Sequence, residues 1–268
     1  MKAVNLVLLI AVSAIAVMVC CFALSSDNNG NQPKDDEKSI GIIGAMSEEV
    51  ETLIEATDVK KTETIADMEF FIGKLHDTNV VIVQSGIGKV NSGICAQMLI
   101  SHFGVDYIIN TGVAGSLDEE LDIGDIVVSS DTVQHDFDVS PIGYQKGEIP
   151  YTGKYAFEAD PVLIELAESA VEVCAPDLIQ KTGRVCSGDQ FIASEEQKER
   201  ILSDFGGLCC EMEGGSIGLV CYLNEVPYVV IRAMSDRADG TGPEDYEEFE
   251  KIAAILCANI VEYMISQM

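Results

Sequence analysis

The sequence predicts one α/β domain, with a central mixed sheet flanked by helices, preceded by a hydrophobic N-terminal segment. Uninterrupted apolar runs of strand length alternate with longer segments of helical period, the pattern of strands buried under helices on both faces. No internal repeat is present, and 268 residues with 47% hydrophobic side chains are enough for one large core. We therefore expect a single globular domain after the hydrophobic segment.

The elements follow in order along the chain. The apolar runs predict strands at 40–43, 69–75, 80–84, 107–110, 126–128, 183–187, 208–210 and 228–231. The periodic segments predict helices at 48–55, 90–103, 161–173, 195–205, 216–223 and 243–268. Pro161 is compatible with the start of its helix, because proline is favoured in a first turn. Residues 131–158, with scattered glycine, proline and aromatic residues, are expected to be mostly loop.

Residues 1–26 are expected to be a signal peptide or a membrane anchor. Between Leu6 and Leu24 the only conventional polar residue is Ser13, and such a run is long enough to cross a bilayer as a helix. Lys2 precedes the run and acidic residues follow it, which favours a domain outside the cytoplasm, although a cytoplasmic-facing domain stays open. Residues 27–38 are predicted to be a linker, and 39–268 the folded domain.

Composition excludes several classes of partner. The formal net charge of −29 disfavours binding to nucleic acid or to an anionic membrane surface, since both would repel the protein. The nine cysteines lie singly or adjacent in apolar runs without C-x-x-C spacing, and the chain has only three histidines. Buried free thiols are therefore expected, with neither a disulfide framework nor a zinc site.

The candidate chemical groups are carboxylates that follow predicted strands. Glu49 follows the first strand, Glu211 and Glu213 follow the run 208–210, and Asp236 follows the strand at 228–231. In α/β folds such strand ends carry ligand sites, and paired carboxylates suit acid–base chemistry at a sugar carbon. Each of them taken singly is more typical of a solvated side chain than of a catalytic one, and it is their shared location that favours a site.

The glycine clusters that follow predicted strands have two interpretations. They are compatible with tight turns or with backbone that approaches a ligand closely. None matches a Walker loop or the G-x-G-x-x-G fingerprint, and the chain has no Gly-x-Ser-x-Gly elbow.

Six stretches together resemble the 5′-methylthioadenosine/S-adenosylhomocysteine nucleosidases of the purine nucleoside phosphorylase/uridine phosphorylase superfamily. They run in the same order as in that family from about residue 40 to the C-terminus. The stretches are 41–50 (GIIGAMSEEV), 85–90 (SGIGKV), 109–115 (INTGVAG), 187–192 (SGDQFI), 211–213 (EME) and 232–236 (RAMSD). The resemblance implies a nucleoside phosphorylase-like fold, a homodimer, and no cofactor or metal.

The resemblance also implies a reaction, hydrolysis of the bond between adenine N9 and the ribose anomeric carbon. Asp236 would protonate adenine N7, Glu49 would activate water, and Glu213 would hold the ribose hydroxyls. Other residues would contact the substrate without taking part in proton transfer. Met46 and Met212 would pack on the ribose and thioalkyl group. Phe191 would stack on adenine, and the backbone of Ile192 would hydrogen-bond to the edge of the base. The remaining contacts would come from Ile87, Val113, Ala114, Gly115, Glu211, Arg232 as partner of the carboxylates, and Ser235 beside Asp236.

Some positions depart from the family pattern. Val113 replaces a frequent serine, Cys210 replaces an aliphatic residue, and Gln134 replaces an expected aromatic residue in the alkylthio pocket. Three alternatives stay open: an aminofutalosine hydrolase, a phosphate-dependent phosphorylase, and a membrane-tethered nucleoside-binding or adhesion protein without catalysis. A phosphorylase would hold phosphate with arginines near the glycine loops, and no arginine lies near Gly86 or Gly112 in sequence.

Overall fold

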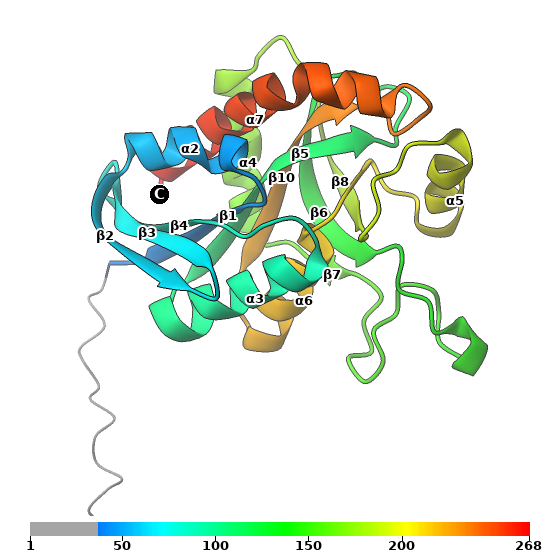
Figure 1. The fold of residues 1–268 in the computed structure, drawn as a ribbon, viewed down its shortest axis with the longest axis horizontal. Coiled ribbons are helices and arrows are strands. Elements are labelled where there is room, and N and C mark those ends of the chain that lie inside the picture. Colours follow the sequence, from blue (N-terminus) through cyan, green and yellow to red (C-terminus); the bar gives the residue numbers. More distant parts are fainter. Residues whose placement is uncertain (1–36) are drawn as a thin grey trace, which may run out of the picture. The chain divides into compact units, whose positions relative to one another are not determined.

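The computed structural model describes residues 37–268 (Figure 1). The expected leader at 1–26 and nearly all of the expected linker lie outside the described residues. Within 37–268, no helix is both long enough and apolar enough to cross a membrane.

A ten-stranded mixed sheet forms the centre of the domain. Its strands are β1 (Ser39–Gly44), β2 (Asp58–Ile65), β3 (Met68–Leu75), β4 (Thr78–Gln84), β5 (Tyr107–Ser116), β6 (Ile126–Gln134), β7 (Phe157–Glu158), β8 (Gln180–Ser187), β9 (Cys209–Glu211) and β10 (Tyr228–Asp236). The order is β10-β6-β8-β9-β5-β1-β4-β3-β2, and β10 also pairs with β5. That extra pairing closes β5, β10, β6, β8 and β9 into a ring, with parallel and antiparallel neighbours.

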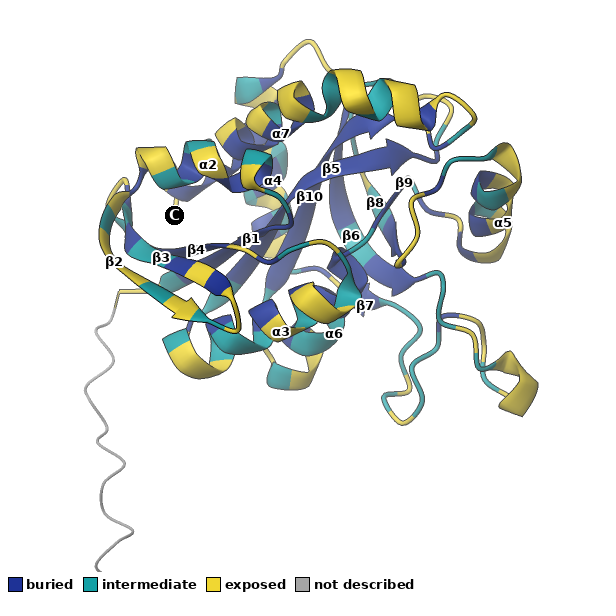
Figure 2. Ribbon diagram, viewed as in Figure 1, coloured by how far each residue is buried: buried dark blue, intermediate teal, exposed yellow. Residues whose placement is uncertain are grey.

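Helices cover the sheet on two faces. They are α2 (Ser47–Ala56), α3 (Lys89–Met98), α4 (Pro161–Cys174), α5 (Glu195–Phe205), α6 (Gly214–Asn224) and α7 (Gly242–Ser266), with a π-helical extension of α3 at Leu99–Phe103. In Figure 1, α2, α4 and α7 lie on one face, while α3 and α6 pack together on the other. The strands between them are largely buried (Figure 2), which is why their sequences are continuously apolar. The predicted fold class is confirmed.

One long strand of the sheet was missing from the prediction. Strand β2 was not expected, because its sequence DVKKTETI is polar; it is an edge strand with mostly exposed side chains and pairs only with β3 among the described strands. The segment 131–158 is mostly loop, as predicted, apart from the end of β6, which continues to Gln134, a 3₁₀ turn at Ser140–Ile142, and β7, which pairs with β6. The polar residues of this part of β6 are satisfied inside the fold, as in the 2.9 Å contact between the hydroxyls of Thr132 and Tyr228.

Candidate active site

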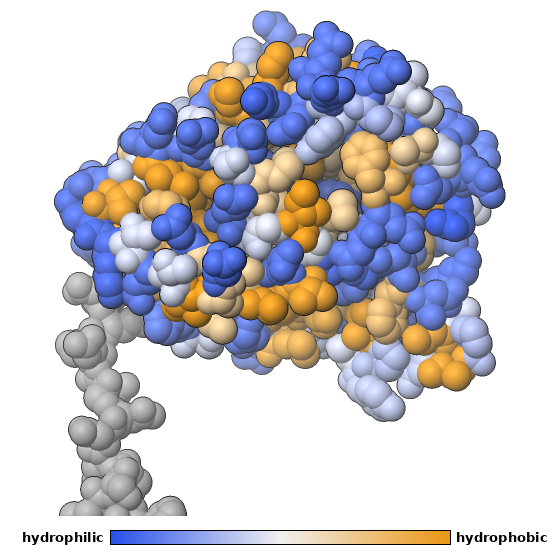
Figure 3. Space-filling view, in the orientation of Figure 1, coloured by the Kyte–Doolittle hydropathy of each residue, from blue (hydrophilic) through white to orange (hydrophobic). Residues whose placement is uncertain are grey.

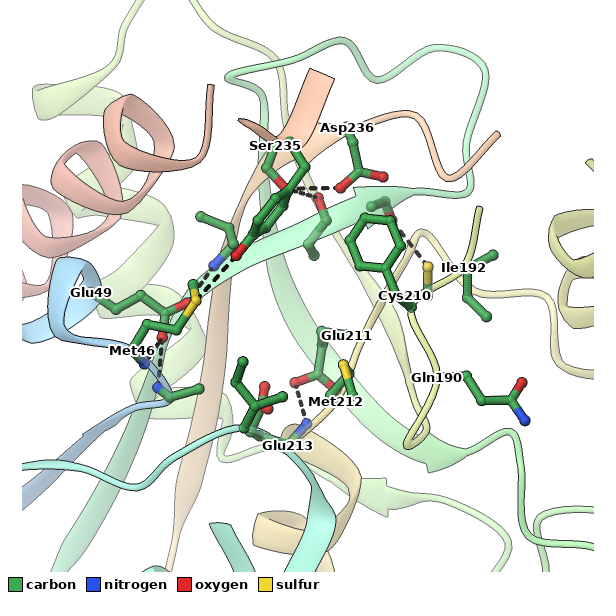
Figure 4. Close-up of a pocket in the computed structure, with 17 residues that line it drawn as sticks. Met46, Glu49, Gln190, Ile192, Cys210, Glu211, Met212, Glu213, Ser235 and Asp236 are labelled. Carbon is green, nitrogen blue, oxygen red and sulfur yellow. Dashed lines mark hydrogen bonds between the residues drawn. The ribbon is translucent and has the colours of Figure 1, made fainter. Parts of the chain in front are cut away.

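The ends of several strands meet around one pocket (Figure 4). Strands β5 and β10 run further than their apolar cores suggested, so residues expected in the following turns belong to the strands themselves. The residues that line the pocket are Ala45, Met46, Glu49, Ile87, Val113, Ala114, Gly115, Gln190, Phe191, Ile192, Cys210, Glu211, Met212, Glu213, Ser235, Asp236 and Tyr246. Every predicted site residue except Arg232 is among them.

Glu49 enters the pocket from the first turn of α2. Its Oε2 accepts hydrogen bonds from the backbone N–H groups of Ala45, at 2.6 Å, and Met46, at 3.0 Å, and its Oε1 accepts one from Val113, at 3.1 Å. The side chain is 2% exposed. Burial raises the pKa of Glu49 above its ordinary value, although Arg232 and these amides oppose the shift. The carboxyl is thus held rigidly, in an environment suited to proton transfer.

Gly112 on β5 makes this arrangement possible. A Cβ at that position would lie 2.2 Å from Glu49 Oε1 and 2.3 Å from Arg232 Nη1. No larger residue fits between these two side chains. Close packing therefore explains why a glycine occupies position 112 in the stretch 109–115.

Arg232 lies beneath the pocket and is completely buried. Its Nη2 donates to Glu211 Oε2, to Asn110 Oδ1 at 2.6 Å and to Glu213 Oε2 at 3.3 Å. Glu49 Oε1 lies 3.9 Å from Nη1. One buried guanidinium therefore faces three buried carboxyl groups, and the predicted role of Arg232 as their partner agrees with this geometry.

Glu213 is the residue before α6. Among residues 37–268, two groups donate hydrogen bonds to its carboxylate oxygens. Gly88 N–H donates to Oε1 at 2.9 Å, and Arg232 reaches Oε2. Burial raises the pKa of Glu213, and the neighbouring carboxylates of Glu211 and Glu49 raise it further. The glycine turn before α3 thus contributes a backbone donor to the site.

Asp236 ends β10 on the other side of the pocket (Figure 4). Its Oδ1 accepts from Ala238 N–H at 2.8 Å, and its Oδ2 accepts from the Ser235 hydroxyl at 2.9 Å. Both hydrogen bonds favour the ionised form, but burial outweighs them and raises the pKa of Asp236. A carboxyl that keeps its proton toward neutral pH is what a general acid needs.

Apolar and aromatic side chains complete the walls. Phe191 packs edge-on against Tyr246 of α7, with ring centroids 5.5 Å apart. The Tyr246 hydroxyl donates to the Met46 sulfur at 3.1 Å, which links α7 to α2 across the pocket. Phe191 is 44% exposed and lines the pocket.

Four residues line the pocket that were not predicted to do so, and they are Ala45, Gln190, Cys210 and Tyr246. Ala45 and Gln190 lie inside the stretches 41–50 and 187–192, and Cys210 directly precedes the stretch 211–213, so the position of these three was a usable signal. Tyr246 belongs to a helix that only the fold brings back over the pocket, and its sequence contained no such signal.

The seven described cysteines are free thiols, and six of them are buried. The described part of the chain contains no group of three or more His, Cys, Asp or Glu side chains arranged to hold a metal ion.

The model of the phosphorylase superfamily matches residues 39–266, and the ring of strands with its carboxylate-lined pocket is consistent with that class of protein. A 5′-methylthioadenosine/S-adenosylhomocysteine nucleosidase of Staphylococcus aureus (strain JH9) is 43% identical over 230 residues, which are 85% of this chain and 100% of that protein. The chain therefore belongs to the 5′-methylthioadenosine/S-adenosylhomocysteine nucleosidase family.

Solved structures of nucleosidases and of a related hydrolase share the fold of this chain. The nucleosidase of Neisseria meningitidis, crystallised with methylthio-immucillin-A, aligns with a TM-score of 0.83 at 35% identity, over 86% of this chain and 100% of that one. A futalosine hydrolase of Helicobacter pylori aligns with a TM-score of 0.82 at 34% identity, over 86% of this chain and 98% of that one.

Proposed function

We propose that this protein hydrolyses the N-glycosidic bond of 5′-methylthioadenosine and S-adenosylhomocysteine, releasing adenine and the corresponding thioribose; 5′-deoxyadenosine is a further expected substrate. Such a reaction serves methionine salvage and the recycling of S-adenosylmethionine by-products. The observation that carries the proposal is the placement of Glu49, Glu213 and Asp236 around one pocket. The family membership and the named activity of the relatives support the same reading.

We propose one role for each of the three carboxyl groups, and their surroundings support these roles. Asp236 donates its proton to adenine N7 as the bond from N9 to C1′ breaks, so the bonding electrons leave with a neutral base. Glu213, ionised when substrate is bound, accepts hydrogen bonds from the ribose hydroxyls and stabilises positive charge developing at C1′. Glu49 takes a proton from the water whose oxygen attacks C1′. Phe191 stacks on the adenine ring, and Met46 and Met212 pack on the ribose and thioalkyl group.

Water rather than phosphate is the proposed nucleophile. No lysine, arginine or histidine appears among the described side chains that line the pocket. Arg232, the nearest guanidinium beneath it, is already shared by Glu211 and Glu213. A phosphate dianion here would meet carboxylates without a compensating cation, which is strongly unfavourable in a buried site.

A substrate panel tests the proposal and its closest alternative, supported by the likeness to a futalosine hydrolase. The full-length protein is given methylthioadenosine, S-adenosylhomocysteine or aminofutalosine in phosphate-free buffer. We expect kcat/KM for adenine release to be higher with methylthioadenosine and S-adenosylhomocysteine than with aminofutalosine. Preference for aminofutalosine would move the assignment to the sister hydrolase. No turnover of any of the three would leave a nucleoside-binding protein.

Ser235 gives a prediction about the pH dependence. Because its hydroxyl stabilises the ionised form of Asp236, Ser235→Ala should raise the pKa of that carboxyl further. Asp236 then keeps its proton to higher pH, so the alkaline limb of the kcat/KM profile should move to higher pH. Ser235→Thr, which retains a hydroxyl, should leave the limb in place. An alkaline limb that stays or moves to lower pH in Ser235→Ala would show that Asp236 is not the titrating acid.

We also propose that the protein is a homodimer. Exposed apolar side chains support a dimer. Six of them lie on or beside α3 and α6 or on the loop after β6, and they are Ile87, Val90, Ile94, Ile142, Tyr151 and Leu223. Figure 3 shows apolar side chains gathered over the α3 and α6 face. Exposed apolar patches of this kind typically mark protein interfaces. Light scattering should give twice the chain mass; a monomer at micromolar concentration would contradict the proposal.

We further propose that residues 1–26 place the domain outside the cytoplasm, on the charge asymmetry around the apolar run. Protease added to intact cells should then degrade the domain, whereas protection until lysis would indicate a cytoplasmic-facing domain.

A further inference from the structure

The carboxylate of Glu211 joins the first turn of α6 to the floor of the pocket. Its Oε2 accepts hydrogen bonds from the backbone N–H groups of Glu213, at 3.0 Å, and Gly214, at 2.8 Å. Its Oε1 accepts the Ser187 hydroxyl proton, and that same hydroxyl accepts the N–H of Gly215 at 2.5 Å. Glu211 and Ser187 together satisfy N–H groups that the start of a helix otherwise leaves without partners.

Glu211 also has the closer contact with Arg232. The Nη2 that donates to Glu211 Oε2 lies 3.3 Å from Glu213 Oε2, a longer and weaker contact. Asn110, whose own amide is fixed by a hydrogen bond to the Ile43 carbonyl, holds the same nitrogen from another direction. The guanidinium is therefore anchored on Glu211 and Asn110 rather than on Glu213.

This sharing leaves Glu213 partly unsatisfied. An ionised carboxylate has about four lone-pair sites. Gly88 N–H and the long contact from Arg232 occupy two of those on Glu213, and the side chain lines the pocket. In contrast, Glu211 has four donors within reach, which are Ser187, Arg232 and two amides. Of these two neighbouring acids, Glu213 is the one with free acceptor capacity for a ligand.

We propose that Glu211 is a positioning residue, whose charge holds Arg232 and the start of α6 so that Glu213 is free to bind the two ribose hydroxyls. The inference rests on the proposed function, because it assumes a substrate that carries those hydroxyls. The physical basis of the proposal is that Glu211 and Glu213 compete for one buried cation, Arg232. Without the negative charge of Glu211, Arg232 pairs with Glu213 and occupies the lone pairs that the ribose needs.

The effect of Glu211 on the titration of Glu213 is consistent with this view. The Glu211 carboxylate raises the pKa of Glu213, whereas Arg232 lowers it. Removing the charge of Glu211 is therefore expected to lower the pKa of Glu213, as its carboxylate becomes an ion-paired group.

Glu211→Gln tests the proposal with two ligands. We compare kcat/KM for methylthioadenosine with kcat/KM for its analogue lacking both ribose hydroxyls, in the wild-type and variant full-length proteins. With methylthioadenosine the variant should lose about tenfold to a hundredfold, the range of a charge-assisted hydrogen bond. With the dideoxy analogue the loss should be threefold or less. Comparing the two proteins on one substrate cancels the intrinsic lability of that substrate.

A merely structural role for Glu211 would lower both values by the same factor, and that result would overturn the proposal. Ser187→Ala, which removes one donor to Glu211, should reproduce the pattern more weakly and serves if Glu211→Gln does not fold. Glu172→Gln, an exposed residue of α4 with the same change of charge, should behave like wild type. If the wild-type protein releases no adenine from methylthioadenosine, the proposed function itself has failed. That outcome is distinct from equal losses on both substrates.

Discussion

Replacing Asp236 by asparagine should lower adenine release by about 10²–10⁴-fold, the usual contribution of a positioned general acid. An amide of nearly the same shape accepts the hydrogen bond from Ala238 N–H, but its N–H protons are not acidic enough to be transferred to adenine N7. Binding of a non-hydrolysable C-nucleoside analogue of methylthioadenosine, measured by calorimetry, should therefore change little.

Asp239 offers a matched control for that variant. It lies three residues further on, outside the pocket lining, with its carboxylate accepting from Thr241. Asp239→Asn should retain near wild-type turnover. Near-normal turnover in Asp236→Asn would show that another group protonates the base.

Replacing Arg232 by methionine should cost about 3–5 kcal/mol of unfolding free energy, the range for breaking a buried ion pair by removing one partner. Glu49, Glu211 and Glu213 would remain buried with no cation between them. Carboxyl groups whose folded pKa lies above the unfolded value destabilise a protein increasingly as pH rises through that interval. The loss should therefore be greater at pH 7 than at pH 5, because protonation relieves the repulsion at the lower pH.

Arg184→Met is the matched control for the stability measurement. Arg184 is partly exposed and pairs with one carboxylate, Asp131, at 2.6 Å. Its replacement should cost less and depend less on pH. Equal losses for the two variants in denaturant unfolding would mean that the three carboxyl groups around Arg232 do not act as a cluster.

Much of this fold was predictable because buried strands leave a clear apolar signal. Strand β2 lacked that signal, since an edge strand can be polar on both faces and still pair. The extensions of β5 and β10 were missed for a related reason. Their polar residues, such as Ser116 and Ser235, are buried and satisfied by hydrogen bonds that only the folded chain provides.

The site was predictable where its residues fall in short stretches, as with Glu213 and Asp236. The different roles of the neighbouring acids Glu211 and Glu213 could not be predicted from the sequence. Glu211 and Glu213 differ in role because Arg232, Ser187 and the start of α6 surround one and leave the other facing the pocket. Ser187 and Arg232 lie on other strands, 24 and 21 residues from Glu211 in the chain.

The most direct test of the central claim is to run the reaction in water enriched in oxygen-18, with and without inorganic phosphate. Hydrolysis predicts one labelled oxygen at the anomeric carbon of the released methylthioribose, and adenine release that phosphate does not accelerate. Adenine release that requires phosphate, with an unlabelled ribose 1-phosphate as product, would contradict the account.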